Sequence, residues 1–272
     1  MRLLLILFSF SLLPSFAIAE VIIDGFKMPE SVIQDKEGNI YVSEIGERDV
    51  DKDGKITMID KSGNLTTIVN DLYDPKGIVL FDNKLYVTDR DVVVEVDIEN
   101  KTSAVYAGTM QFPRSPVFLN DIDVDDKGNL YVSDSGDFKN TGQIFLIKNT
   151  GDIETIFEDE RNLIKAPNGL LLDGDKLYIL DWGGEFFQVN LNKKSFKKIA
   201  EGFNGGDGIA KVNDTFFLSS WLEGKLYKLT SGKTEIINDN FEAAADISLS
   251  QDKKKVYIPD MKAGSLTILD VN

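Results

Sequence analysis

The sequence lacks two residue types entirely, because none of its 272 residues is cysteine or histidine. Without cysteine the chain can form no disulfide, offers no thiol for a lipid anchor and has no thiolate ligand for a soft metal. Without histidine it cannot build a Ser/Cys–His catalytic pair, and zinc loses both of its usual ligands. Any metal bound by this chain must therefore be held by oxygen atoms.

Basic residues are scarce relative to acidic ones. Thirty Lys and Arg against 45 Asp and Glu give a formal net charge of −15. This balance argues against nucleic acid and anionic membrane surfaces as partners, since both prefer basic patches. The sequence also contains no Gly-x-Ser-x-Gly elbow and no Walker loop, so nothing indicates an organic cofactor.

Long apolar runs are confined to the start of the chain. Arg2 precedes an apolar run from Leu3 to Leu13, and small residues stand just before Glu20. This pattern predicts a signal peptide over residues 1–19, because the run is too short to cross a membrane comfortably. We expect the mature chain, 20–272, to be exported to the periplasm or the exterior as a monomer. No linker composition interrupts it, so a single domain is expected.

Six copies of a short motif, a turn followed by an alternating strand with an aromatic residue, recur through the mature chain. The clearest copies are Gly-Asn-Ile-Tyr-Val-Ser-Glu at 38–44, Asn-Lys-Leu-Tyr-Val-Thr-Asp at 83–89 and Gly-Asn-Leu-Tyr-Val-Ser-Asp at 128–134; weaker copies lie at 175–181, 214–220 and 254–260. Their aromatic residues are 39 to 47 positions apart. This period suits four-stranded blades, and the period-two apolar pattern argues against helices.

Counting strands indicates how the repeats close. The third repeat reads as four strands, Ile122–Val124, Leu130–Ser133, Gln143–Ile147 and Ile153–Phe157, whereas the sixth repeat has only three. The segment Val21–Ile23 is a spare strand that could complete the last sheet and remove an exposed edge. We therefore predict an all-β fold, a six-bladed β-propeller whose last blade is closed by the N-terminal strand.

A polar residue precedes each aromatic residue of the motif by 10 or 11 positions. These six ring residues are Glu30, Lys76, Asn120, Asn168, Asp207 and Asp246. In a propeller such equivalent positions converge at one mouth of the central channel. Two carboxylates and two amide oxygens, from Glu30, Asn120, Asn168 and Asp207, form an all-oxygen set that suits Ca²⁺, with Mg²⁺ or Mn²⁺ as alternatives. The competing interpretation is that these side chains satisfy free backbone groups in turns.

A catalytic role can be written for this ring from its chemistry. A divalent cation would polarise a substrate carbonyl, and we assign Asp207 as the catalytic residue that accepts a proton from water. Asp121, beside Asn120, would support the ligands or bind through water. Lys76 either counters a substrate carboxylate or a developing negative charge, or it pairs with Asp246 or a neighbouring carboxylate and has no chemical role.

A second metal signal lies within the first repeat. The residues from Asp49 to Asp60 match an EF-hand-type loop at its positions 1, 3, 5, 6 and 12. The pattern predicts a structural calcium loop made by Asp49, Asp51, Asp53, Lys55 and Asp60. The alternative is an acidic turn that needs Gly54 for its backbone geometry.

The segments around the ring residues resemble a known family. Pro29-Glu30, Leu119-Asn120-Asp121, Pro167-Asn168-Gly169 and Gly206-Asp207-Gly208 are similar to the four metal-ligand segments of the gluconolactonase/regucalcin (senescence marker protein) family, whose relatives include diisopropyl fluorophosphatase and, more distantly, paraoxonases. The resemblance implies a divalent cation held by Glu30, Asn120, Asn168 and Asp207, and hydrolysis of lactones or organophosphates. The histidine that paraoxonases use beside the metal is missing here.

Three functions remain, and one of them, a strictosidine-synthase-like activity, is disfavoured because the four-residue metal set is retained. The first is an exported, calcium-dependent hydrolase of a small-molecule lactone or related ester. The second is a non-catalytic, metal-bearing propeller that binds a small ligand or a partner protein, because one fold can serve many functions. Candidates for substrate contact are Arg90, Arg114, Arg161, Trp182 and Trp221. The better interpretation of the arginines is that they are ordinary surface residues, and the tryptophans could instead pack between blades.

Overall fold

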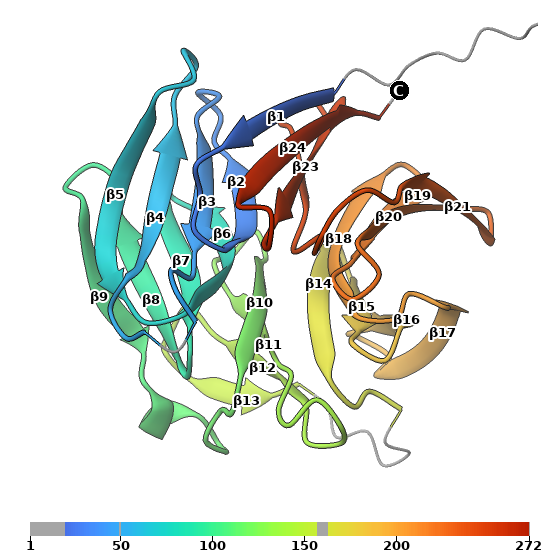
Figure 1. The fold of residues 1–272 in the computed structure, drawn as a ribbon. Coiled ribbons are helices and arrows are strands. Elements are labelled where there is room, and N and C mark those ends of the chain that lie inside the picture. The colour runs from blue at the N-terminus through green and yellow to red at the C-terminus, as the bar shows by residue number, and fades with distance from the viewer. Residues whose placement is uncertain (1–19, 49, 157–162, 272) are drawn as a thin grey trace, which may run out of the picture.

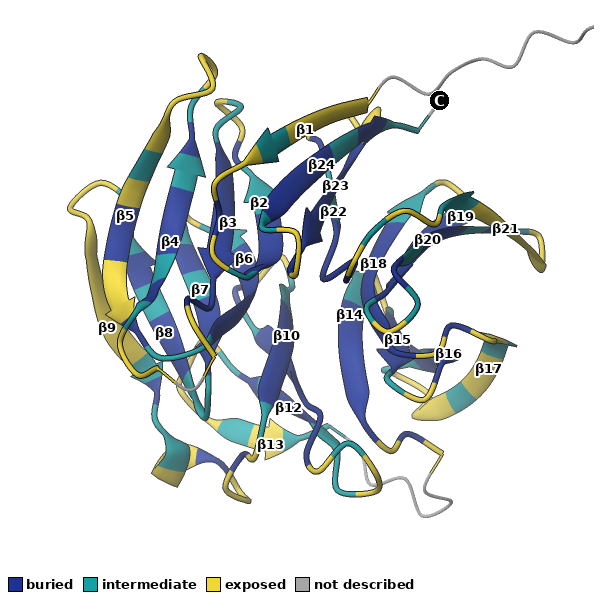
Figure 2. Cartoon of the chain, viewed as in Figure 1, coloured by how far each residue is buried: buried dark blue, intermediate teal, exposed yellow. Residues whose placement is uncertain are grey.

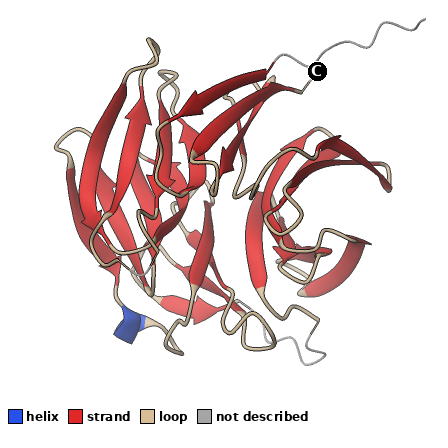
Figure 3. Ribbon diagram, viewed as in Figure 1, coloured by secondary structure: helices blue, strands red, loops and turns tan. Residues whose placement is uncertain are grey.

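The structure is a computed structural model, and it describes residues 20–48, 50–156 and 163–271. Within these ranges, 24 strands form six four-stranded antiparallel sheets, and one 3-10 turn spans Thr109–Gln111. The predicted six-bladed β-propeller is confirmed (Figures 1 and 3). The predicted signal peptide, 1–19, lies outside the described residues, as do Asp49 and Arg161. No described helix is long and apolar enough to cross a membrane.

Each of the first five blades is continuous in sequence. Blade 1 comprises β2 (Pro29–Gln34), β3 (Ile40–Glu44), β4 (Gly54–Ile59) and β5 (Leu65–Leu72), and blade 2 comprises β6 (Pro75–Phe81), β7 (Lys84–Asp89), β8 (Val92–Asp97) and β9 (Thr102–Ala107). Blade 3 comprises β10 (Leu119–Val124), β11 (Leu130–Asp134), β12 (Gln143–Ile147) and β13 (Ile153–Thr155). Blade 4 comprises β14 (Pro167–Asp173), β15 (Lys176–Asp181), β16 (Glu185–Asn190) and β17 (Ser195–Glu201), and blade 5 comprises β18 (Gly206–Val212), β19 (Thr215–Ser220), β20 (Lys225–Thr230) and β21 (Lys233–Asn238).

The last blade contains both ends of the described chain. Its strands, from the channel outward, are β22 (Ser248–Leu249), β23 (Lys255–Asp260), β24 (Ser265–Asp270) and β1 (Glu20–Asp24). β1 pairs antiparallel with β24, with Glu20 opposite Leu269 and Asp24 opposite Ser265. The prediction that the N-terminal strand closes the last blade is confirmed.

The first strand of each blade lies at the channel. These inner strands, β2, β6, β10, β14, β18 and β22, contact one another in succession, and β22 also contacts β2. The ring is therefore closed. Burial follows the same plan, because the strands near the channel are mostly buried and the outer strands β9, β17 and β21 are mostly exposed (Figure 2).

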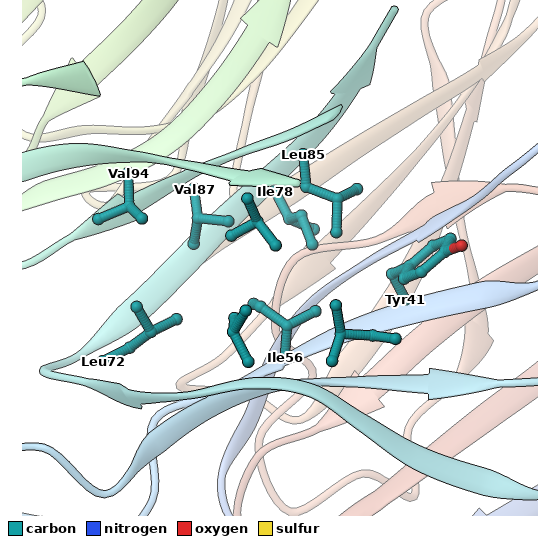
Figure 4. Close-up of a cluster of buried hydrophobic side chains, with 10 residues drawn as sticks. Tyr41, Ile56, Leu72, Ile78, Leu85, Val87 and Val94 are labelled. Carbon is teal, nitrogen blue, oxygen red and sulfur yellow. The ribbon is translucent and has the colours of Figure 1, made fainter. Parts of the chain in front are cut away.

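The hydrophobic core is divided into clusters between neighbouring blades rather than one central core. Between blades 1 and 2, Tyr41, Ile56 and Leu72 face Ile78 and Leu85 (Figure 4). Equivalent clusters lie at each of the other five junctions. Burial of this apolar area, at roughly 25 cal/mol per Å², is what holds the blades together.

The repeated motif explains this packing. Its aromatic residue is buried against the following blade in most repeats, as Tyr131 of blade 3 packs with Leu170 of blade 4. Its last residue, an Asp or Glu in five of the six repeats, accepts hydrogen bonds from the loop that precedes the inner strand. Asp134, for example, accepts from the N–H groups of Val117 and Phe118. Hydrogen bonds to a charged acceptor of this kind contribute roughly 1.5–3 kcal/mol each.

Candidate functional site

Five of the six predicted ring residues occupy the same place in their blades. Glu30, Lys76, Asn120, Asn168 and Asp207 are each the second residue of an inner strand, and each side chain is 2–4% exposed. In all five strands the pairing register shifts between the first and fourth residues. Such an irregularity re-aims a side chain, and here it directs the ring residues toward the channel mouth.

Hydrogen bonds from the repeated motif fix the backbone of the ring residues. The Ser or Thr of the motif donates to the carbonyl of the ring residue in the next blade, Ser43 to Lys76, Thr88 to Asn120 and Ser133 to Asn168. Ser219 makes a comparable bond to the carbonyl of Ala245. These positioning residues were not among the predicted site residues, although the Ser/Thr at one place in the motif was their visible signal.

Glycines that follow ring residues permit a close approach of neighbouring inner strands. A Cβ on Gly169 would lie 1.9 Å from the carbonyl oxygen of Asp207, and a Cβ on Gly208 would lie 2.2 Å from the amide nitrogen of Ile247. Neither distance is compatible with a side chain. The glycines in the Asn-Gly and Asp-Gly pairs therefore serve backbone packing rather than turns.

The five ring residues form the floor of a pocket of about 460 Å³. Its walls are mostly apolar. Besides the ring residues, the lining comprises Met28, Ile45, Arg48, Asp74, Phe118, Phe138, Trp182, Trp221 and Met261. A concave, largely apolar pocket with convergent polar groups at its base has the usual character of a small-ligand site.

Three oxygens at the pocket floor have no hydrogen-bond partner. They are Glu30 Oε2, Asn168 Oδ1 and Asp207 Oδ1, which come from three different blades. The amide nitrogen of Asn168 donates to the carbonyl of Gly206 at 3.2 Å, and that of Asn120 donates to Ser135 Oγ at 3.0 Å. Both amides therefore have their nitrogen engaged with the protein, which leaves the oxygen as the group available to a ligand.

This donor set fits a hard divalent cation. Buried oxygens without partners are costly unless something satisfies them, and carboxylate and amide oxygens are the ligands that Ca²⁺ and Mg²⁺ prefer. Among the described residues, no three Asp or Glu side chains are grouped closely enough to hold a metal by themselves. A cation at this floor would therefore depend on Asn120 and Asn168 as well as on Glu30 and Asp207.

Burial and neighbouring negative charges destabilise the charged form of the carboxylates at the floor. Burial, and then the proximity of Asp207 and Asp246, raise the pKa of Glu30 well above its ordinary value. Burial, followed by the charge of Asp246, likewise raises the pKa of Asp207. A bound cation would relieve both effects, because it stabilises the charged form of each carboxylate.

Lys76 lies at the same floor without a carboxylate partner among the described residues. Its Nζ donates to the carbonyl of Asp74 at 3.0 Å and lies 4.3 Å from the centre of the Phe118 ring. Burial lowers the pKa of Lys76, and the nearby charge of Glu30 partly offsets that effect. The predicted alternative, an ion pair of Lys76 with Asp246 or a neighbouring carboxylate, is not formed among the described residues; Lys76 Nζ bonds to a carbonyl instead.

Asp246 and Asp121 lie away from the pocket, at a second cavity of about 260 Å³ in the channel. Asp246 Oδ2 accepts a hydrogen bond from Ser31 Oγ, and burial raises the pKa of Asp246 to about 7. The carboxylate of Asp121 accepts from the N–H groups of Ile122 and Leu170. Asp246 therefore does not join the other five ring residues, and Asp121 links blades 3 and 4.

The structure does not bring the predicted calcium loop together. Gly54 begins β4, so Asp53 and Asp60 lie at opposite ends of that strand, roughly 20 Å apart. Asp60 instead accepts hydrogen bonds from Ser62 and Asn64 in the turn after β4. The pattern matched a loop, but strand formation by the alternating residues after Gly54 separated its two ends.

The remaining residues of that pattern also have other partners. Asp51 forms an ion pair with Arg90 at 2.6 Å, and Lys55 Nζ lies 3.3 Å from Glu44. Asp53 Oδ2 accepts a hydrogen bond from the backbone of Glu47, whereas its buried Oδ1 has no hydrogen-bond partner. Within the described residues this segment is therefore an acidic loop held by ion pairs and backbone contacts.

The predicted substrate residues divide into two groups. Trp182 and Trp221 line the pocket, whereas Arg90 and Arg114 do not. Phe118 and Phe138 also line the pocket and were not predicted, because they belong to loops without a repeat pattern.

Comparison with known proteins identifies the fold. Neither protein-family models nor curated protein sequences match this chain. A solved gluconolactonase from Xanthomonas campestris is similar, with a TM-score of 0.74 at 13% identity over 92% of this chain and 88% of its own. A second protein assigned to the gluconolactonases has a TM-score of 0.74 at 13% identity, over 95% of this chain and 93% of its own. A chain of a nidogen/laminin complex has a TM-score of 0.69 at 19% identity, over 82% of this chain and 84% of its own.

The chain thus has the propeller fold found in solved gluconolactonases, and a related architecture occurs in a complex of two proteins. At these identities the likeness extends to the fold alone, because one architecture serves unrelated functions. The function has to be argued from the pocket.

Proposed function

We propose that this protein is an exported hydrolase that opens a lactone or related ester with the help of a divalent cation, Ca²⁺ ahead of Mg²⁺ or Mn²⁺. The observation that carries the proposal is the group of three unpartnered oxygens, from Glu30, Asn168 and Asp207, at the floor of a pocket of ligand size. The apolar leader before Glu20 supports export.

The residues of the floor have distinct roles in this proposal. Glu30, Asn120, Asn168 and Asp207 would hold the cation, which when bound supplies Lewis-acid polarisation of a carbonyl. Asp207 accepts a proton from the water whose oxygen bonds to the carbonyl carbon, and it returns that proton to the leaving oxygen as the acyl C–O bond breaks. A lactone would yield a hydroxy acid, with no other reactant consumed.

The test is hydrolysis of a panel of lactones and organophosphate esters by the mature protein, with Ca²⁺ or with chelator. We expect turnover that chelator abolishes and that the paired Asn120→Ala, Asp207→Ala variant lacks. The matched control, Asp239→Ala with Asn240→Ala, removes the same residue types from an exposed turn and should retain activity. Calorimetric titration of Ca²⁺ into each variant measures metal binding separately from turnover.

Asp207→Asn separates the two roles of this residue. It keeps an oxygen that can bind metal but removes the proton acceptor. We expect Ca²⁺ affinity to fall by about tenfold, in line with the loss of one charged ligand, while turnover is lost at saturating Ca²⁺. Full turnover in this variant would exclude Asp207 as the base.

A second candidate function is a non-catalytic propeller that binds a ligand or partner protein at its metal-bearing face. The likeness to a chain of a nidogen/laminin complex favours it. Bound Ca²⁺ without turnover of any panel substrate would support this alternative over the hydrolase.

A further inference from the structure

The most unusual group in the pocket is the side chain of Lys76. Four of the five floor residues offer oxygen to a cation, whereas Lys76 places an amine at the equivalent position, 4% exposed. Only one hydrogen bond is made by its Nζ among the described residues, to the carbonyl of Asp74. An ammonium has three donors, so two remain for a ligand in the pocket.

Lys76 forms no ion pair with a carboxylate among the described residues, although the charges of Glu30, Asp74 and Asp89 lie near enough to favour its charged form. The two carboxylates of the floor, Glu30 and Asp207, would balance a divalent cation. Asp74, the remaining acidic residue of the pocket, is paired with Arg90 at 3.1 Å. With metal bound, the floor residues and the cation together therefore have one positive charge in excess, at Lys76, and the pocket lining contains one further cationic residue, Arg48. Because the charge of Lys76 is buried, a ligand with one negative charge would be favoured over a neutral one.

The pocket wall beside Lys76 is a continuous aromatic surface. Phe118 contacts Phe138 with ring centres 4.8 Å apart, Phe138 contacts Trp182 at 5.3 Å, and Trp182 contacts Trp221 at 5.9 Å. All four rings are partly exposed and line the pocket. We call them the aromatic arc. Its Phe118 end lies directly under the amine of Lys76.

An aromatic arc of this kind selects for an apolar ligand body. Burying an apolar ring against such a surface is favourable by roughly 25 cal/mol per Å². A polyhydroxylated ring placed there would leave hydroxyl groups without partners, at a cost for each one. Within the part of the chain that the structure describes, the arc offers one polar group of its own, the indole N–H of Trp182, because the indole of Trp221 donates to Met261 Sδ at 3.2 Å.

We propose that the pocket takes a lactone or ester that has an apolar, aryl-sized body and one carboxylate, with the body on the aromatic arc and the carboxylate on Lys76. This substrate class rests on the metal site of the proposed function. Lys76 is its specificity-determining residue, and Phe118 connects the carboxylate position to the apolar wall.

The experiment uses unreactive lactam analogues, so that binding is measured without turnover. The probe is 1-phenyl-5-oxopyrrolidine-3-carboxylate, which combines a ring carbonyl, a phenyl group and one carboxylate. Its primary carboxamide lacks only the charge, and 5-oxopyrrolidine-3-carboxylate lacks only the phenyl group. Each is titrated calorimetrically into the calcium-loaded mature protein, into Lys76→Met and into Lys262→Met. Lys262 lies over Trp221 at the other end of the arc, 4.2 Å from the ring centre, and is the control.

The expected result is a preference of about 10- to 100-fold for the carboxylate over the carboxamide in the parent protein and in Lys262→Met. Lys76→Met should bind both equally. Removal of the phenyl group should weaken binding by about tenfold or more. If Lys76→Met does not fold, Lys76→Gln, which keeps a polar side chain, replaces it.

Two results would overturn the inference. Equal binding of the carboxylate and the carboxamide by the parent protein would show that Lys76 does not select charge. A preference that persists in Lys76→Met would show that another cation of the pocket, the metal or Arg48, recognises the carboxylate in place of Lys76. Selective binding through Lys76 without turnover of any lactone would rule out the proposed hydrolase function and would support the proposed ligand class. Turnover of neutral lactones without any preference for charge would support the hydrolase and rule out the proposed ligand class.

Discussion

Replacing Gly169 by alanine is expected to disrupt the junction between blades 4 and 5. The added Cβ would lie 1.9 Å from the carbonyl oxygen of Asp207, whereas non-bonded carbon and oxygen atoms need about 3.3 Å or more. The inner strands β14 and β18 must therefore separate by roughly 1 Å. Overpacking costs typically about 1–3 kcal/mol, and a rigid backbone atom places this site at the upper end.

The assay is unfolding by heat and by urea. A loss of about 3 kcal/mol corresponds to a fall in melting temperature of roughly 6–12 °C for a domain of this size. The control is Gly108→Ala, because Gly108 has an ordinary extended backbone, φ −86° and ψ 154°, and a Cβ there would meet no atom closer than 3.5 Å. That variant should differ from the parent by less than about 0.5 kcal/mol.

The same substitution should also weaken metal binding, because it displaces the backbone of Asp207. Calcium titrations of both variants test this link between strand packing and the pocket floor. Unfolding of Gly169→Ala at the same urea concentration as Gly108→Ala would refute the reasoning, since it would mean that β14 and β18 can move apart freely.

Three further predictions follow from the same contacts. Ser133→Ala removes one hydrogen bond to the carbonyl of Asn168 and one from the N–H of Asp121, so urea unfolding should show a loss of about 2 kcal/mol, whereas Ser62→Ala on an exposed turn should show little. In chelator, stability should rise as pH falls from 8 toward 5, because burial raises the pKa of Asp246 to about 7 and the folded state then binds protons more tightly than the unfolded state; Asp246→Asn should flatten this rise, and a parallel curve would count against it. Both tryptophans of the chain line the pocket, so occupying it should change the intrinsic fluorescence, and an unchanged spectrum at saturation would contradict their placement.

The fold was predictable because each blade has its own local signal. The aromatic residue of each motif, such as Tyr41, lies on an alternating strand that is buried on both sides, and the spacing of these residues gives the blade count. Val21–Ile23 could be assigned to the last blade because that repeat lacked a strand. These features depend on short stretches of sequence and on closure of the ring.

The site was only partly predictable, because its details depend on contacts between blades. The matched positions of Glu30, Asn120, Asn168 and Asp207 indicated the floor. The sequence could not show that the N–H of Leu170 engages the carboxylate of Asp121, because 49 residues separate the two partners. Likewise, Phe118 and Phe138 come from loops whose course is set by tertiary packing rather than by a repeat.

The closure of the last blade by β1 has a consequence for how the pocket assembles. Blade 6 stands between blade 1, which supplies Glu30, and blade 5, which supplies Asp207, and it needs strands from both ends of the chain. The closed ring around the floor therefore includes a blade built from both ends of the described chain. A cation that binds across the floor would favour the closed ring over any opened form by mass action. Metal in the surrounding medium would then stabilise the complete, closed ring and would not stabilise a chain whose ring is open.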